Sequence, residues 1–301
     1  MALTSPLPTN ISEKHVGFAG WMDCVLELAE RVRDDWDADT VHDLRVALRR
    51  CRTMAEALSE VNPALGWRKL KKASREIFDS LGKLRDMQVE RGWVKQLGPP
   101  GDPVRRHMLR LLSDREKDHR ENAERALDRF DRKEWRKSSR KLLPKSQFFP
   151  LESVVFQRLA LTRLNEAAEL YRRARKGRSR IAWHRLRIGL KSFRYIVENF
   201  LPQRYEVWAE DLKRMQDVLG EVHDLDVLRS DIRRTCSQLD PAVVAQWLER
   251  IEGEREKRLA GFRSKTTGEE SLWLVWRAGF QWGHAVKAAS LPGPPVVYSA
   301  S

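Results

Sequence analysis

The sequence predicts an all-α protein made of two helical bundles that are related by an internal duplication. Apolar residues recur at helical spacing, and no run alternates as a β-strand between hairpin turns. Three motifs also occur twice in the same order, roughly 140 residues apart. They are a basic helix that begins near His42 and His184, an L-G-x-x-x-D-x-x-V segment at Leu81 and Leu219, and an Asp-Pro pair.

Helices are expected in order from the periodicity and from the residues that end them. In the first half they cover 15–33, 41–58, 66–81, 81–97 and 103–130. Thr40 is expected to cap the helix over 41–58, and Pro63 closes that region, because proline cannot continue a helix. In the second half the expected helices cover 153–175, 178–200, 205–219, a segment from 219 and 241–262, and an apolar segment follows over 272–280.

The chain is divided into four parts on this basis. Residues 1–14 are predicted to be disordered, 15–140 to form the first helical half and 141–265 the second. Residues 266–301 form a C-terminal tail with one apolar helix, which either completes the core or makes a dimer contact. The oligomeric state stays open.

The duplicated basic helix carries one histidine and three cations in a single stripe. Both copies read H-x-x-R-x-x-x-[R/K]-x-x-R, and these offsets fall within roughly an 80° arc of a helix. The stripes are His42, Arg45, Arg49 and Arg52 in the first copy, and His184, Arg187, Lys191 and Arg194 in the second. Because the apolar residues lie on the opposite side, each copy is an amphipathic helix with an almost purely basic polar face.

The overall charge points to an anionic partner. Lys and Arg number 57 against 43 Asp and Glu, which gives a formal net charge of +14, and the pI is about 10.0. Cys24, Cys51 and Cys236 lack metal-ligand spacing and are expected to be buried thiols in a reducing compartment. No signal peptide and no stretch of about 20 apolar residues is present, so we expect a soluble, cytoplasmic protein.

Further cations recur at matching positions of the two halves. Through the L-G register, Arg75 aligns with Lys213 and Arg85 aligns with His223. Arginine and lysine suit phosphate oxygens, and histidine can add a donor. Because a nearby phosphate favours the charged form of histidine, anion binding is expected to strengthen below neutral pH.

Catalysis finds little support in the sequence. There is no phosphate-binding loop, no H-E-x-x-H and no G-x-S-x-G motif, and we expect neither a metal nor a cofactor. A metal site from His42, His184 and His223 would be crowded by cations. The alternating glutamates 252, 254 and 256 are similar to an E-x-E-x-K signature, but they diverge on a helix. Most tryptophans sit in apolar patterns and are expected in the core.

The two basic helices, V-H-D-L-R-V-x-x-R-R-x-R and W-H-R-L-R-I-x-x-K-S-x-R, each followed by the L-G motif, resemble the CHAD family over about residues 15–265. The resemblance implies two helical bundles about a pseudo-twofold axis, with a basic central groove or pore. It also implies binding of inorganic polyphosphate, with possible residence at polyphosphate granules. By position, the implied ligand-facing residues are His42, Arg45, Arg49, Arg52, Lys71, Lys72, Arg75, Arg85, His184, Arg187, Lys191, Arg194, Lys213 and His223.

The second copy departs from the first at several positions. Ser192 stands where the first copy has Arg50, and Glu221 stands where it has Lys83. The second half of the site is therefore expected to be weaker. Many relatives carry a triphosphate-tunnel domain, for which this chain has no room, and this argues against hydrolysis. The expected function is non-enzymatic polyphosphate binding, and the alternatives are a nucleic-acid-binding protein or a metal-dependent phosphohydrolase.

Overall fold

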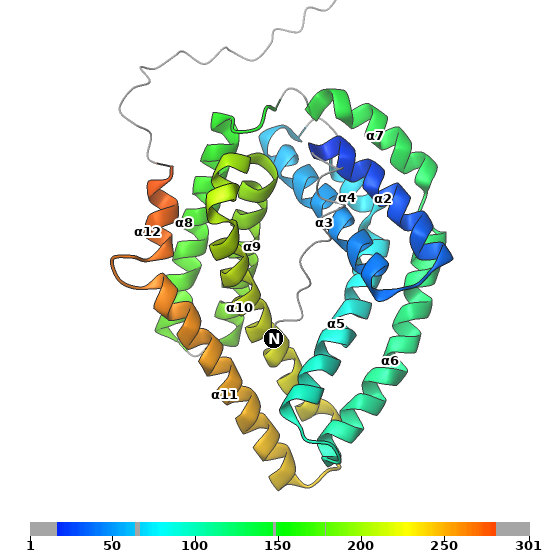
Figure 1. Cartoon of the computed structure of the whole chain (residues 1–301), viewed down its shortest axis with the longest axis vertical. Coiled ribbons are helices and arrows are strands. Elements are labelled where there is room, and N and C mark those ends of the chain that lie inside the picture. Colours follow the sequence, from blue (N-terminus) through cyan, green and yellow to red (C-terminus); the bar gives the residue numbers. More distant parts are fainter. Residues whose placement is uncertain (1–16, 64–66, 147–148, 178, 281–301) are drawn as a thin grey trace, which may run out of the picture.

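The computed structural model describes residues 17–63, 67–146, 149–177 and 179–280, and all regular structure within them is helical (Figure 1). The predicted all-α class is confirmed. The first half of the chain forms α2 (Gly17–Asp34), α3 (Ala38–Val61), α4 (Trp67–Ala73), α5 (Arg75–Leu97), α6 (Pro103–Asp128) and α7 (Arg132–Ser146). The second half forms α8 (Val154–Lys176), α9 (Arg180–Phe200), α10 (Pro202–Thr235), α11 (Pro241–Thr266) and α12 (Leu272–Ala278).

The basic helices predicted over 41–58 and 178–200 are α3 and α9, and their apolar faces are buried. Leu44 and Leu48 of α3 and Leu186 and Leu190 of α9 are all fully covered. The cap of α3 differs from the prediction. Asp37 is the N-cap and accepts hydrogen bonds from the backbone N–H of the third helical residue, Thr40, whose hydroxyl also binds the Asp37 carboxylate. A carboxylate is the stronger acceptor at this position because it also meets the positive end of the helix dipole.

The first half contains a helix break at a different position from the one predicted. A restart was predicted at Leu81 and Leu219, but both residues lie inside continuous helices, α5 and α10. The break falls at Ser74 instead, between α4 and α5. Arg52 of α3 donates a hydrogen bond of 2.7 Å to the backbone oxygen of Lys71, which would otherwise accept from the N–H of Arg75. A long-range contact therefore satisfies the carbonyl that the break leaves unpaired.

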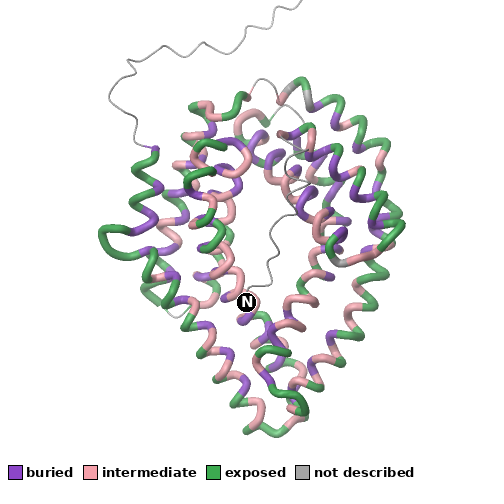
Figure 2. The backbone as a smooth tube through the Cα atoms, viewed as in Figure 1, coloured by how far each residue is buried: buried purple, intermediate pink, exposed green. Residues whose placement is uncertain are grey.

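The two halves of the chain touch in two places. Helices α3 and α9 contact each other at one end of the molecule, and the hairpins α5–α6 and α10–α11 converge at the other end (Figure 1). A separate apolar cluster holds the converging hairpins together; it includes Trp93 and Met108 from the first half, and Leu228 and Trp247 from the second. Figure 2 shows buried and exposed positions interspersed along the helices, as expected for amphipathic helices.

Asp-Pro pairs begin the second helix of each hairpin. Asp102 and Asp240 are the N-caps of α6 and α11, and each carboxylate accepts a backbone N–H of the first turn. Trp247 donates from Nε1 to the Asp102 carboxylate at 2.8 Å. This hydrogen bond links the N-cap of α6, in the first half, to α11, in the second half. A Cβ added at Gly98 would lie 2.3 Å from the Trp247 ring, so glycine is needed for this close approach.

The apolar tail segment completes the core of this chain. Helix α12 buries Leu272, Trp273 and Trp276. Trp273 stacks on Tyr171 with ring centroids 5.7 Å apart, and Trp276 lies 5.6 Å from Phe193. Of the two alternatives left open for this segment, the core contact is the one observed.

Some predictions fall outside the described residues. These include the predicted disorder over 1–14, and most of the C-terminal tail from 281 to 301. The proposed half boundary at 140/141 lies inside α7, which packs against α2 and α4. Within the described ranges, no helix is both long and apolar enough to cross a membrane.

Candidate anion-binding site

Eight of the fourteen predicted site residues come together near the α3–α9 contact, from four helices. Helix α3 supplies three of them, α5 one, α9 three and α10 one. We call this set the central cluster; its members are His42, Arg45, Arg49, Arg85, His184, Arg187, Lys191 and His223. The four helices belong to both halves of the chain, so the cluster exists only in the folded protein.

The basic stripes of α3 and α9 approach the same aromatic ring. The guanidinium of Arg49 and the ammonium of Lys191 each lie 5.6 Å from the centroid of the Tyr195 ring. Burial, and after it the nearby charges of Arg49 and Arg187, lower the pKa of Lys191 to about 7. The Lys191 ammonium is therefore held at a site that disfavours its own charge.

The histidines of the cluster are also held neutral. The Nδ1 atoms of His184 and His223 lie 3.2 Å apart, so a hydrogen bond between them needs one protonated and one unprotonated Nδ1. Burial lowers the pKa of His223 to about 4, and Arg187 adds to this effect. The pKa of His42 is also about 4, first because of burial and then because of Arg85. These imidazoles are therefore uncharged at neutral pH in the unliganded protein.

Two carboxylates lie near the cluster, the aspartates of the duplicated L-G motif. Asp86 and Asp224 are in the interior of α5 and α10, so they do not cap these helices. Burial raises the pKa of Asp224 to about 6, although Arg187 opposes the rise. Neither carboxylate comes within 4.0 Å of Arg187 or Lys191 in an ion pair. Their negative charge reduces the positive potential of the central cluster but does not cancel it.

Four cations of the central cluster lack an acidic partner. Among the described residues, Arg45, Arg49, Arg187 and Lys191 form no ion pair with a carboxylate. The Nε of Arg45 is buried and has no hydrogen-bond partner there. Like charges this close repel each other, and the repulsion is stronger in a partly desolvated site than in water. An anion placed among these residues would relieve it.

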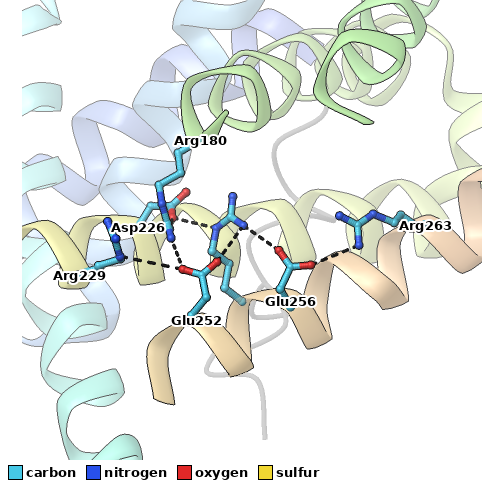
Figure 3. Close-up of polar contacts among 7 residues, drawn as sticks. Arg180, Asp226, Arg229, Glu252, Glu256 and Arg263 are labelled. Atoms are coloured by element: carbon cyan, nitrogen blue, oxygen red, sulfur yellow. Dashed lines mark hydrogen bonds and ion pairs between the residues drawn. The ribbon is translucent and has the colours of Figure 1, made fainter. Parts of the chain in front are cut away.

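A network at the start of α9 shows how this protein pairs its cations elsewhere (Figure 3). Arg255 of α11 has a 4% exposed side chain and binds Asp226 at 2.9 Å and Glu256 at 3.1 Å. Arg180 of α9 binds both Asp226 and Glu252. Every cation in the network meets at least one carboxylate, unlike the four unpaired cations of the central cluster.

The alternating glutamates of α11 are used in ion pairs. Glu252 and Glu256 face Arg255, whereas Glu254 binds Arg258, which also binds Glu221 at 2.8 Å. The prediction that these glutamates diverge on a helix is confirmed. Across the described residues, no group of three or more His, Cys, Asp and Glu side chains is arranged to hold a metal ion.

Four other predicted residues lie apart from the cluster and line a pocket of about 460 Å³ where α4 breaks from α5. We call it the α4 pocket; its lining residues are Arg52, Arg68, Lys71, Lys72, Arg75 and Asp79. Arg68 was missed by the sequence reasoning. It belongs to the basic segment W-R-K-L-K-K, and helical spacing from Lys71 and Lys72 could have identified it.

The last two predicted residues, Arg194 and Lys213, lie among acids. The Arg194 Nε is 3.6 Å from Glu198, whose side chain is only 7% exposed. Arg50 of α3 also binds Glu198, at 2.5 Å. Lys213 is exposed. Burial raises the pKa of the nearby Asp217, and the charge of Lys213 opposes this larger effect by lowering it. The charge of Arg194 is thus largely compensated within the protein.

The sequence difference at Ser192 has a structural counterpart. Arg50, which Ser192 replaces in the second copy, joins α3 to α9 through Glu198 and through Asn199 at 3.3 Å. It also lies 4.6 Å from the centroid of the Trp21 ring. Arg50 is therefore a structural residue of the contact between the halves, and its loss from the second copy does not remove an anion ligand.

The tryptophans are mostly buried. The six that were expected in the core (Trp21, Trp183, Trp208, Trp247, Trp273 and Trp276) are all buried, as predicted. Trp36 is partly buried and packs against the core. The three cysteines are buried free thiols. Base stacking on tryptophan therefore has no support among the described residues.

Comparison with known proteins places this geometry in a family. The profile of the CHAD domain matches residues 21–233, which is well over half of the chain. The crystal structure of the CHAD domain from the plant Ricinus communis is similar, with a TM-score of 0.57 and 21% identity over 96% of each chain. The structure of PptA from Streptomyces chartreusis gives a TM-score of 0.61 at 13% identity, over 86% of this chain and 99% of the other. No curated protein matches the sequence. The chain belongs to the CHAD domain family.

Proposed function

We propose that this protein binds inorganic polyphosphate through the central cluster, without catalysing a reaction. The observation that carries the proposal is a set of four cations without a carboxylate partner, Arg45, Arg49, Arg187 and Lys191, which α3 and α9 bring together and two of which, Arg45 and Lys191, are strongly desolvated. The resemblance to the CHAD family implies the same ligand. The proposed site is a basic groove or pore between the two halves of the chain, which the duplicated helices α3 and α9 would line together.

The chemistry of the cluster suits a linear chain of phosphates. Arginine forks and a lysine ammonium donate charge-assisted hydrogen bonds to phosphate oxygens, and each such bond contributes about 1.5–3 kcal/mol. A polyphosphate carries charge along its length without bulky bases, so it can reach cations that lie on two facing helices. Binding should weaken steeply with added salt, because the polyanion releases its counterions.

No resident cofactor or metal and no hydrolytic activity belong to the proposal. We also propose a cytoplasmic location at polyphosphate granules, because these granules hold the proposed ligand. A nucleic acid is the second candidate partner, since the net charge of +14 would attract any polyanion. Because no exposed tryptophan is found among the described residues, base stacking on tryptophan gives a nucleic acid no advantage there.

Competition between polyanions tests the proposal. Long-chain polyphosphate is bound near physiological salt and then challenged with single-stranded DNA and with RNA at equal phosphate concentration. We expect that nucleic acid fails to displace the polyphosphate, because the central cluster contacts phosphates from two facing helices. If nucleic acid competes equally with polyphosphate, the central cluster is only a generic basic surface. Phosphate release on adding a divalent metal would favour the phosphohydrolase alternative instead.

We expect polyphosphate affinity to rise as the pH falls from about 8.5 to about 5.5. In the unliganded protein the pKa of Lys191 is about 7, and those of His42 and His223 are about 4. A bound polyanion favours the charged forms and raises these pKa values, so protons are taken up on binding. Uptake of one proton changes the affinity tenfold per pH unit over the window between the free and bound pKa values.

Calorimetry in buffers of different ionisation enthalpy measures this proton uptake directly. Lys191→Arg is the matched variant, because arginine keeps its charge throughout and should remove the part of the pH dependence above about pH 7. An affinity that stays constant or falls with decreasing pH would show that these groups do not face the ligand.

A further inference from the structure

The α4 pocket lies at the helix break, outside the central cluster, and is strongly basic. Five cations and one carboxylate line its volume of about 460 Å³. Arg52 is fixed there by hydrogen bonds to the backbone oxygen of Lys71 and to the Ser74 hydroxyl, at 2.7 and 3.2 Å. The break itself therefore shapes the pocket and holds one of its arginines in place.

Acids within the pocket neutralise only part of its charge. Lys71 binds Glu56 at 2.8 Å, and Arg75 lies 3.5 Å from Asp79. Arg68 and Lys72 form no ion pair with any described residue, and both are exposed. The exposed charges of Arg68 and Lys72, together with the partly buried Arg52, are thus available to an anion.

The corresponding surface of the second half is not basic. In the L-G register, Arg68, Lys71 and Lys72 correspond to Glu206, Ala209 and Glu210. The equivalent of Arg52 is Arg194, which Glu198 compensates at 3.6 Å. Helix α10 also continues without the break that forms the pocket. Among the described residues, the basic residues of α4 and the helix break therefore occur in the first half without a counterpart in the second, whereas the central cluster draws on both halves.

The Arg50–Glu198 pair accounts for part of this asymmetry. Glu56 and Glu198 occupy equivalent positions of α3 and α9. Arg50 reaches across to Glu198, but its counterpart Ser192 has no charge with which to reach Glu56. Glu56 instead binds Lys71 at the pocket rim. Among the described residues, Arg52 therefore forms no ion pair, although Asp79 and Glu56 act on its pKa from a longer distance.

The pocket and the central cluster share one aromatic neighbour, Phe78. The guanidinium of Arg45, in the cluster, lies 5.9 Å from the centroid of the Phe78 ring, and that of Arg52, in the pocket, lies 4.7 Å from it. A linear polyanion that leaves the cluster along α3 on this side would therefore approach Arg52 next, on the other side of its contact with Phe78.

We propose that the α4 pocket is a second subsite for the same polyphosphate chain and gives binding a direction. Chains too short to leave the central cluster bind there alone, whereas longer chains continue past Phe78 into the pocket. The second contact is intramolecular once the chain is bound, so it raises the affinity of long chains selectively. This inference rests on the proposed function of the central cluster.

Arg68→Glu tests the proposal, with Lys69→Glu as its matched control. Both residues are exposed on α4, but only Arg68 lines the pocket. Affinities for tripolyphosphate and for long-chain polyphosphate are measured on each variant at fixed salt. We expect Arg68→Glu to weaken long-chain binding about tenfold or more, as the loss of one charge-assisted contact predicts. Tripolyphosphate binding should stay within about twofold, since a surface charge outside contact distance is largely screened.

The outcomes separate this proposal from the proposed function. Equal effects of Arg68→Glu and Lys69→Glu, or equal losses for short and long chains, would overturn the subsite. Failure of the unmodified protein to bind either polyphosphate would instead refute the proposed function. The double variant Glu206→Lys with Glu210→Lys adds cations to the second half and should raise long-chain affinity. If it has no effect, the basis for a one-sided site is lost.

Discussion

Replacing Arg49 and Arg187 with glutamine should lower polyphosphate affinity at least 100-fold and leave the unliganded protein at least as stable as before. Each arginine would lose charge-assisted hydrogen bonds that contribute about 1.5–3 kcal/mol, and 1.4 kcal/mol corresponds to a tenfold change in affinity. Neither arginine has an acidic partner among the described residues. Removing them breaks no ion pair of the described residues, although the pKa of Asp224 should rise further without Arg187.

The stability of this double variant is the more diagnostic measurement. Arg49 and Arg187 both lower the pKa of Lys191, so their removal should raise it from about 7. Relief of this repulsion predicts a melting temperature equal to or above that of the unmodified protein. Residues that exist only to hold the fold together would behave in the opposite way.

The control removes the same charge from outside the site. Arg136 on α7 and Arg185 on α9 are exposed, and Arg185→Gln with Arg136→Gln should reduce affinity only slightly, through the smaller net charge. Titration calorimetry gives the affinities, and thermal unfolding gives the stabilities. Similar losses of affinity in both double variants would remove the central cluster as the site, and a large loss of stability in the first would assign it a structural role.

Arg255→Met should destabilise the fold by about 3 kcal/mol. Removing one member of a buried ion pair leaves the other charges uncompensated, which typically costs about 3–5 kcal/mol. The lower end applies here because Asp226 and Glu252 keep Arg180 as a partner (Figure 3). Urea unfolding monitored by tryptophan fluorescence measures the change.

Arg263→Met provides the comparison within the same network. Its side chain is 40% exposed and binds Glu256 at 3.3 Å, so its loss should cost less than about 1 kcal/mol. The folded fraction of both variants should bind polyphosphate as before, since the network lies outside the central cluster. Equal stabilities of the two variants would contradict the importance of burial for Arg255.

Local patterns in the sequence were sufficient for the helices and their faces. The spacing of Leu44, Leu48, Leu186 and Leu190 predicts the buried sides of α3 and α9, because helical geometry depends only on neighbouring residues. The same periodicity predicts that the cations of each basic stripe lie on one face of their helix. The repeat register aligned Arg85 of α5 with His223 of α10, and the family resemblance then implied that both face the ligand.

Contacts between distant residues decided the rest. The break at Ser74 depends on Arg52, 22 residues away, and no propensity in the segment itself marks it. Likewise, Arg52 and Arg194 hold equivalent positions in the sequence, yet only Arg194 meets a compensating glutamate.

The sequence by itself therefore determined the all-α class, the family and the residues of the basic stripes, since these follow from short-range periodicity and motif spacing. Only the tertiary structure decided which cations remain unpaired. Charge compensation depends on distances of a few ångströms between side chains from different helices, and the Arg50–Glu198 pair joins residues 148 positions apart. On that side Glu198 compensates Arg194, whereas the α4 pocket of the first half is lined by cations that include Arg68, which the duplicated motifs did not identify.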